Sequence, residues 1–165
     1  MGIAPCLEED LAQVKDHEIY DFMAVGLDCS DRVLFDIQHA CTYHTEEFEQ
    51  FKLRRQKISG NLDYQTHSHK QPADRIWPLV APSPFSGSSA FLGCQAAVGM
   101  GYKKIILCGC PMQGKNLINE KTQAYDAFQQ GWIKYAPGMF GDKVKSMSGF
   151  TMSLLGYPTE EWLRE

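Results

Sequence analysis

The sequence has no apolar run of the about 18 residues that a membrane-spanning helix requires. Residues 1–6 contain no basic segment followed by an apolar stretch, so they predict no secretory signal. The chain also lacks an excess of basic residues, because 16 Lys and Arg stand against 20 Asp and Glu for a net charge of −4. Nucleic acids and anionic membranes favour a basic face. We therefore expect a cytoplasmic protein with neither of these partners.

Internal repeats, low-complexity tracts and linkers are also missing, which argues against repeat arrays and tethered domains. Apolar residues make up 44% of the chain and charged residues 22%, as in an ordinary globular protein. A chain of 165 residues can bury a substantial core, so we expect a single domain over residues 1–165. Its six cysteines, without a secretory signal, are expected to be reduced and buried.

Short apolar segments alternate with segments of helical spacing along the chain. Strands are expected at residues 22–27, 39–43, 64–66, 76–80, 103–109 and 143–147, with Pro78 placing 76–80 at an edge. Helices are expected at residues 7–14, 45–57, 86–98 and 119–135, followed by a helical turn at 158–163. This alternation predicts a three-layer α/β domain with a mostly parallel sheet. Such sheets bind ligands beyond the carboxyl ends of their strands.

The segment Ser86-Gly87-Ser88-Ser89 follows a strand and opens a predicted helix. Backbone N–H groups at a helix N-terminus have no partner within the helix, and Gly87 lets a ligand approach them closely. The serine hydroxyls add donors, so the segment suits a phosphate or a carboxylate. The alternative is that one serine caps a core helix and the other small residues serve packing. A second turn, Ser148-Gly149, follows the last strand and either lines the same cleft or caps the tail.

Two further side chains at strand ends are candidates for chemistry. Asp28 ends a buried strand, where its carboxylate could reach a ribose hydroxyl or a metal ion, or could cap the next helix. His44 follows a strand and precedes a helix, which suits a general base or a phosphate contact. The alternative for His44 is a hydrogen-bonded surface histidine.

Two pairs of possible metal ligands alternate along extended segments. His67 and His69 share one face if the chain is extended there, and so do Cys108 and Cys110. Their one-residue spacing differs from the usual Cys-x₂₋₄-Cys pattern of zinc sites. We therefore assign no metal site, and we expect both histidines in a loop at the mouth of the ligand site. Arg55 is expected at the solvated end of the 45–57 helix.

Two segments, FSGSSA at residues 85–90 and GYKKIILCGC at 101–110, resemble part of the bacterial CMP-sialic-acid-dependent sialyltransferases. They are also similar to the 6-hydroxymethyl-dihydropterin diphosphokinase-like proteins. Residues 2–8, GIAPCLE, look like the first nucleotide-contacting loop of those families, with Cys6 in place of a serine. The resemblance implies a Rossmann-like fold that binds a nucleotide, of the CMP type or ATP, or a nucleotide-sugar. It places two loops at the ligand, the 86–89 turn and the loop of Ala4, Pro5 and Cys6. Further ligand-binding candidates follow the strand, at Cys110, Pro111 and Met112.

The resemblance implies a glycosyltransferase-like or diphosphokinase-like transferase. In such a mechanism the 86–89 segment holds a phosphate and the 4–7 loop contacts the other side of the nucleotide. Asp28 engages ribose or metal, and His44 performs acid–base chemistry. Pro111 stands where the families have an acidic residue, so the alternative is a non-catalytic binding module on the same fold.

The families also have a full apolar strand before the 2–8 loop. We therefore expect a domain that lacks a full first strand, or that completes its sheet with a partner such as a second copy.

Overall fold

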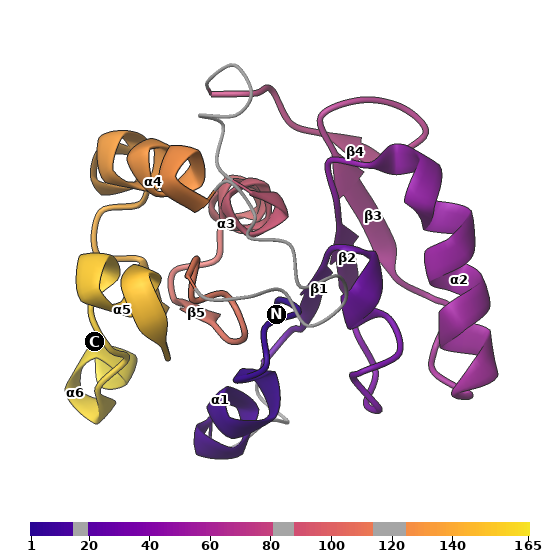
Figure 1. Ribbon diagram of the computed structural model, residues 1–165, viewed down its shortest axis with the longest axis horizontal. Coiled ribbons are helices and arrows are strands. Elements are labelled where there is room, and N and C mark those ends of the chain that lie inside the picture. Colours follow the sequence, from indigo (N-terminus) through magenta and orange to yellow (C-terminus); the bar gives the residue numbers. More distant parts are fainter. Residues whose placement is uncertain (15–19, 81–87, 114–124) are drawn as a thin grey trace.

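The computed structural model describes residues 1–14, 20–80, 88–113 and 125–165, and it contains parallel sheets with helices packed on them (Figure 1). Strands β1 (Met23–Val25), β2 (His39–Cys41), β3 (Gln65–Ser68) and β4 (Arg75–Ile76) form a four-stranded parallel sheet in that order. Strands β5 (Ile105–Leu107) and β6 (Val144–Ser146) form a two-stranded parallel sheet. The expected α/β class with parallel strands is confirmed, and β4 lies at an edge as Pro78 predicts.

The α-helices of the described residues are α1 (Leu7–Gln13), α2 (Phe48–Lys57), α3 (Ser89–Met100), α4 (Tyr125–Phe140), α5 (Gly149–Leu155) and α6 (Glu160–Arg164). Helix α2 ends where expected, but residues 45–47 before it form a 3-10 turn. Helix α4 continues beyond the expected residue 135. Its Pro137 is exposed, so water can satisfy the carbonyl that loses its helical partner. Helix α5 was not expected, because the sequence analysis interpreted its first residues as a Ser-Gly turn.

Residues 1–4 join the two sheets. The Met1 α-amino group donates to the Met23 carbonyl at 2.6 Å, and the Val25 N–H donates to the Met1 carbonyl at 2.8 Å. On the other side, the Gly2 N–H donates to the Cys108 carbonyl at 2.8 Å. The N-terminus therefore lies between β1 and β5, as Figure 1 shows. The carboxyl ends of the strands on both sides consequently meet at one edge.

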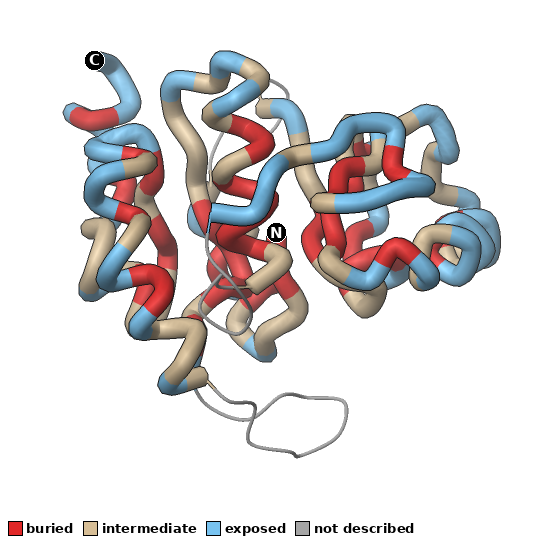
Figure 2. The backbone as a smooth tube through the Cα atoms, turned by 90° about the horizontal axis from the view of Figure 1, so that it is seen from above, coloured by how far each residue is buried: buried red, intermediate tan, exposed pale blue. Residues whose placement is uncertain are grey.

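Helix α3 forms the centre of the hydrophobic core. Its Phe91 and Leu92 are fully buried, and the Phe91 ring centroid lies 4.9 Å from that of Trp132 on α4. At Gly93 a Cβ atom would come within 2.9 Å of Val25 Cγ1, so glycine allows α3 to pack closely on β1. Figure 2 shows buried residues concentrated around the strands and α3, whereas the outer helix α2 is mostly exposed.

The expectation that Arg55 lies at a solvated helix end is wrong, because its side chain is 0% exposed. Its guanidinium donates to the carbonyls of Val33 at 2.6 Å and Phe35 at 3.0 Å, and to Asn61 Oδ1 at 2.9 Å. Arginine carries five N–H donors, so one side chain can satisfy several carbonyls of a buried loop. Arg55 thus holds the connection between β1 and β2 against α2.

The six cysteines carry free thiols. Five of them are buried as expected, whereas Cys6 is only half-buried. Burial raises the pKa of the Cys41, Cys108 and Cys110 thiols to about 12, so these thiols stay protonated at neutral pH. In the described part of the chain, no helix combines the length and the apolar character needed to span a membrane.

Candidate functional site

Most residues that the sequence singled out follow the carboxyl ends of strands. Asp28 follows β1, His44 follows β2, the 110–112 loop follows β5 and Ser148-Gly149 follows β6. Residues 4–6 follow the N-terminal segment between the two sheets. Ser88 and Ser89 begin α3, whereas Ser86 and Gly87 lie outside the described residues. The tertiary structure therefore gathers the predicted loops at one edge of the parallel strands.

A buried carboxylate ties three of these loops together. Asp10 on α1 is 2% exposed, and its Oδ2 accepts hydrogen bonds from the Gly109 N–H at 2.7 Å and from Ser148 Oγ at 2.8 Å. Ser148 Oγ also lies 3.3 Å from Cys6 Sγ. The side chains of Cys6 and Ser148 thus have partners within the protein and stabilise the loops. No local pattern singles out Asp10, because an acid in the first turn of a helix is typical of an exposed position.

The loop after β5 packs against the segment after β6. Thr151 Oγ1 donates to the Cys110 carbonyl at 2.7 Å, and the Phe150 N–H donates to the Pro111 carbonyl at 2.9 Å. Gly149 has a φ of +67°, and a Cβ there would lie 2.3 Å from Pro111 Cβ. Cys110 and Met112 lie in the hydrophobic core. The structure therefore brings the predicted loops 110–112 and 148–149 together as packing partners.

The N-terminus of α3 carries a buried hydroxyl that has no partner among the described residues. Ser88 precedes the helix, but its hydroxyl makes no capping hydrogen bond, and Ser88 Oγ is buried with no partner among the described residues. Ser89 Oγ accepts a hydrogen bond from the Tyr43 N–H at 3.3 Å, which places the end of β2 beside this helix end. The first amides of this 12-residue helix have no side-chain cap and can therefore hold an anion.

His69 lies next to the end of β2. Its ring centroid is 5.3 Å from that of Tyr43, and its Nδ1 is buried without a partner among the described residues. Burial lowers the pKa of His69, and the nearby charges of Lys70 and His44 lower it further. His44 itself is 65% exposed, and its Nδ1 lies 3.4 Å from Glu46 Oε1. This is the position of a surface histidine, the alternative that the sequence left open for His44.

Asp28 lies in the 3-10 segment Leu27–Cys29, and Gly26, not Asp28, precedes that segment. Its Oδ1 accepts a hydrogen bond from Arg54 Nη1 of α2 at 2.9 Å. A ribose hydroxyl or a metal ion would have to compete with this ion pair. The side chain that the sequence proposed for such a role is therefore paired within the fold.

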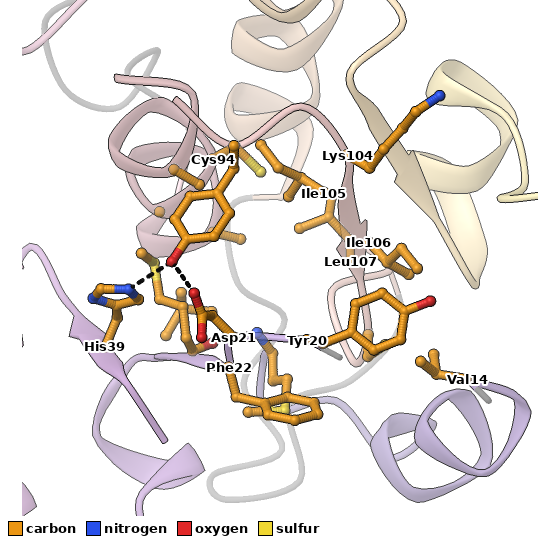
Figure 3. A pocket seen from close by; sticks show the side chains of 18 of the residues that line it. Val14, Tyr20, Asp21, Phe22, His39, Cys94, Lys104, Ile105, Ile106 and Leu107 are labelled. Atoms are coloured by element: carbon orange, nitrogen blue, oxygen red, sulfur yellow. Dashed lines mark hydrogen bonds between the residues drawn. The ribbon is translucent and has the colours of Figure 1, made fainter. Parts of the chain in front are cut away.

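His67 lies within β3 and is 0% exposed, which corrects the expectation of a loop position. Trp77 Nε1 donates to His67 Nδ1 at 3.1 Å, and His67 Nε2 lies 3.1 Å from His39 Nδ1. An indole N–H only donates, so His67 carries its proton on Nε2 and donates to His39. His39 Nε2 then lies 3.2 Å from the Tyr102 hydroxyl, which donates to Asp21 (Figure 3).

This chain of hydrogen bonds from Trp77 to Asp21 is called the histidine relay below. Burial lowers the pKa of His67 to about 4 and also lowers the pKa of His39, so both are neutral at neutral pH. Burial and the adjacent Asp21 raise the pKa of Tyr102 to about 12. No sequence signal indicated the relay, since Tyr102 and Asp21 are 81 residues apart in the chain.

The histidine and cysteine pairs form no metal centre. In the ranges that the structure describes, no group of three or more His, Cys, Asp and Glu side chains is arranged to hold an ion. His67 instead uses both ring nitrogens within the relay. The geometry therefore gives no support to the zinc alternative for His67, His69, Cys108 and Cys110.

Comparisons of the chain with protein-family models, with curated proteins and with solved structures find no match. Function is therefore inferred from the residues and their geometry. Two regions stand out: the carboxyl edge with Ser88, Ser89 and His69, and the histidine relay near the amino ends of β1 and β2.

Proposed function

We propose that the protein binds a nucleotide or a nucleotide-sugar, with a phosphate group at the N-terminus of α3. The observation that carries this proposal is Ser88 Oγ, a buried hydroxyl at that helix end without a partner among the described residues. A buried polar atom costs free energy unless it is hydrogen-bonded, and a phosphate oxygen would accept its proton. The uncapped amides and the dipole of α3 favour an anion at the same place.

A three-layer Rossmann-like arrangement is part of this proposal. With residues 1–4 between β1 and β5, the two sheets would form one parallel sheet. Val25 packs in the cluster of α3 and α4, whereas its neighbour Ala24 packs with Leu7 of α1 and Phe51 of α2. Successive strand residues face opposite sides, so helices would cover both faces. Ligands of such sheets bind where the strand order reverses, which here is at residues 1–4, beside the 4–6 loop.

A transferase would also need an acid–base group at the ligand, and His44 remains the histidine proposed for that role. A non-catalytic binding module is the second candidate, and the ion pair between Asp28 and Arg54 favours it. Pro111, in place of the acidic residue expected from the resemblance, favours it as well. Assays for hydrolysis and transfer with each nucleotide that binds distinguish the two candidates.

Thermal unfolding with CMP, CDP, UDP, ATP, CMP-sialic acid and inorganic phosphate tests the proposal. A ligand that binds the folded state raises Tm with its concentration. Ser88→Ala should weaken binding about tenfold, since a lost hydrogen bond to a charged group costs roughly 1.5 kcal/mol. Without ligand its Tm should be unchanged or higher, because the substitution removes a buried hydroxyl that has no partner among the described residues.

Ser153→Ala is the matched control. Ser153 is an exposed serine of α5 whose hydroxyl donates to the Gly149 carbonyl at 3.3 Å, so its removal should leave ligand binding unchanged. Equal loss of binding in both variants would show that the phosphate does not contact Ser88. If none of the six compounds raises Tm in the unmodified protein, the nucleotide proposal is wrong.

A further inference from the structure

The imidazole of His69 lies on the face of the sheet that α3 covers. Cys41 of β2 is on this face, because a Cβ at Gly93 of α3 would lie 3.9 Å from the Cys41 Cβ. His67 of β3 is the register partner of Cys41. Side chains two residues apart in an extended segment point to the same face. His69, which follows His67 by two residues, therefore points toward α3 as well.

The first turn of α3 lies at the same edge of the sheet, beside the end of β2. Helix α3 packs on β1, β2 and β3. Ser89 Oγ accepts the Tyr43 N–H at 3.3 Å, and the centroid of the Tyr43 ring lies 5.3 Å from that of His69. Ser88 directly precedes Ser89. Tyr43 therefore contacts both the start of α3 and His69, and it brings Ser88 and His69 into one neighbourhood.

Two separate elements each place a buried polar atom in this neighbourhood. Ser88 Oγ and His69 Nδ1 are both buried, and neither forms a hydrogen bond among the described residues. Almost all buried polar atoms in proteins have a hydrogen-bond partner. A hydroxyl and a protonated imidazole nitrogen can both donate, and a phosphate group has several oxygens that accept. One phosphate group would therefore supply the partner of both atoms.

The charges around His69 favour an anion. The titratable groups next to it are Lys70, the following residue, and Tyr43 and His44 at the end of β2. The carboxylate of Glu46 lies 3.4 Å from His44 Nδ1. Helix α3 contains no charged residue and has no acid in its first turn. In the part of the chain that the structure describes, no carboxylate forms an ion pair with His69, so an anionic ligand would meet no competing charge there.

The charge of the phosphate group distinguishes the classes of ligand. A terminal phosphate carries a charge of about −1.5 to −2 at neutral pH, whereas a diester phosphate of a nucleotide-sugar carries a single charge. Burial, Lys70 and His44 lower the pKa of His69 from its ordinary 6.5, so without ligand the imidazole is mostly neutral at pH 6.5. A phosphate dianion at Nδ1 favours the imidazolium and raises this pKa. The terminal phosphate, with the larger charge, gains more from this contact.

We propose that a terminal phosphate of the ligand binds between Ser88 and His69, and that His69 Nδ1 takes up a proton on binding and forms a charged hydrogen bond to a phosphate oxygen. This inference rests on the proposed phosphate site at α3, and it adds the residue that recognises the second charge of the phosphate. Nucleotides that end in a phosphate are then preferred to nucleotide-sugars, in which each phosphate is a diester.

NMR titration of the histidine ring protons tests the protonation of His69 in the unmodified chain. The probes are methyl phosphate, a monoester, and dimethyl phosphate, a diester, and the His69 signal is the one that His69→Asn lacks. Saturating methyl phosphate should raise the pKa of His69 from below 6.5 to above 6.5, and dimethyl phosphate should raise it less. An unchanged pKa with methyl phosphate, no binding of methyl phosphate, or an equal rise with both probes would overturn the inference.

Substitutions separate this inference from the proposed function. His69→Ala should weaken methyl phosphate binding at about pH 6.5 at least tenfold, since a hydrogen bond between charged groups is lost. His69→Asn, which keeps an uncharged donor, should weaken it less, and Ser153→Ala should leave it unchanged. Weaker binding in Ser88→Ala, together with unchanged binding in His69→Ala, would overturn the inference and leave the phosphate site at α3 standing. If no nucleotide and neither phosphate probe binds the unmodified chain, both proposals are wrong.

Discussion

The histidine relay makes the protein sensitive to mild acid. His67 is buried, and its Nδ1 accepts the Trp77 N–H, so protonation of its imidazole is unfavourable in the folded protein. The pKa of His67 therefore falls from the ordinary 6.5 to about 4. The unfolded chain binds a proton at this histidine below pH 6.5, but the folded chain does so only below about pH 4. The contribution of His67 to the free energy of unfolding is therefore fully present above pH 6.5. It is lost as the pH falls from 6.5 to about 4.

The size of the effect follows from the two pKa values. One pKa unit corresponds to about 1.4 kcal/mol, so the shift of His67 predicts a loss of roughly 3 kcal/mol below the window. Between about pH 7.5 and about pH 5, the loss should be about 2 kcal/mol. His39, whose pKa burial also lowers, changes stability in the same direction.

Urea unfolding at these two pH values, in the unmodified protein and in His67→Gln, measures the effect. A glutamine can accept from Trp77 and donate to His39 without titrating, so His67→Gln should lose about 2 kcal/mol less between the two pH values. His44→Gln, the removal of an exposed imidazole, is the control. If the unmodified protein and His67→Gln lose the same stability on acidification, the assignment of a neutral, buried His67 is wrong.

Three further substitutions or reactions test the packing. Asp10→Ala should cost about 3 kcal/mol in urea unfolding, since two buried donors lose their acceptor, whereas Asp10→Asn, which keeps an oxygen, should cost less. Arg55→Met should cost at least about 3 kcal/mol, whereas Arg54→Met, which removes a partly exposed ion pair, should cost at most about 1 kcal/mol. A thiol reagent should modify Cys6 in the folded protein and the five buried cysteines only after unfolding, as mass spectrometry would show.

Local patterns were sufficient for most of the described elements, with α5 the exception, but not for the environment of each side chain. The apolar run at residues 103–109 contains β5. The hydroxyl and the acids at residues 45–47 form the turn that precedes α2. The same reasoning placed Arg55 in solvent, because a basic residue in the last turn of a helix is usually exposed there. Burial of Arg55 is stable only because main-chain carbonyls of residues 30–35 accept hydrogen bonds from its guanidinium.

The candidate site shows the same division. The sequence placed Ser88 at a helix N-terminus. Serine and glycine residues before an apolar helical segment favour a helix start there, and this preference depends only on neighbouring residues. It did not show that Ser148 is bonded to Asp10, because that contact joins residues 138 apart in the chain. It likewise could not show that Asp28 is paired with Arg54, a contact between neighbouring elements.

By itself, the sequence determined the α/β class, the parallel strands, the reduced cysteines and the order in which the loops occur. These properties depend on spacing and composition within short segments, where each residue acts through its neighbours in the chain. The tertiary structure alone decided that His67 joins a relay and that Asp10 ties three loops. Such features depend on which distant segments meet, and no local pattern records the partner.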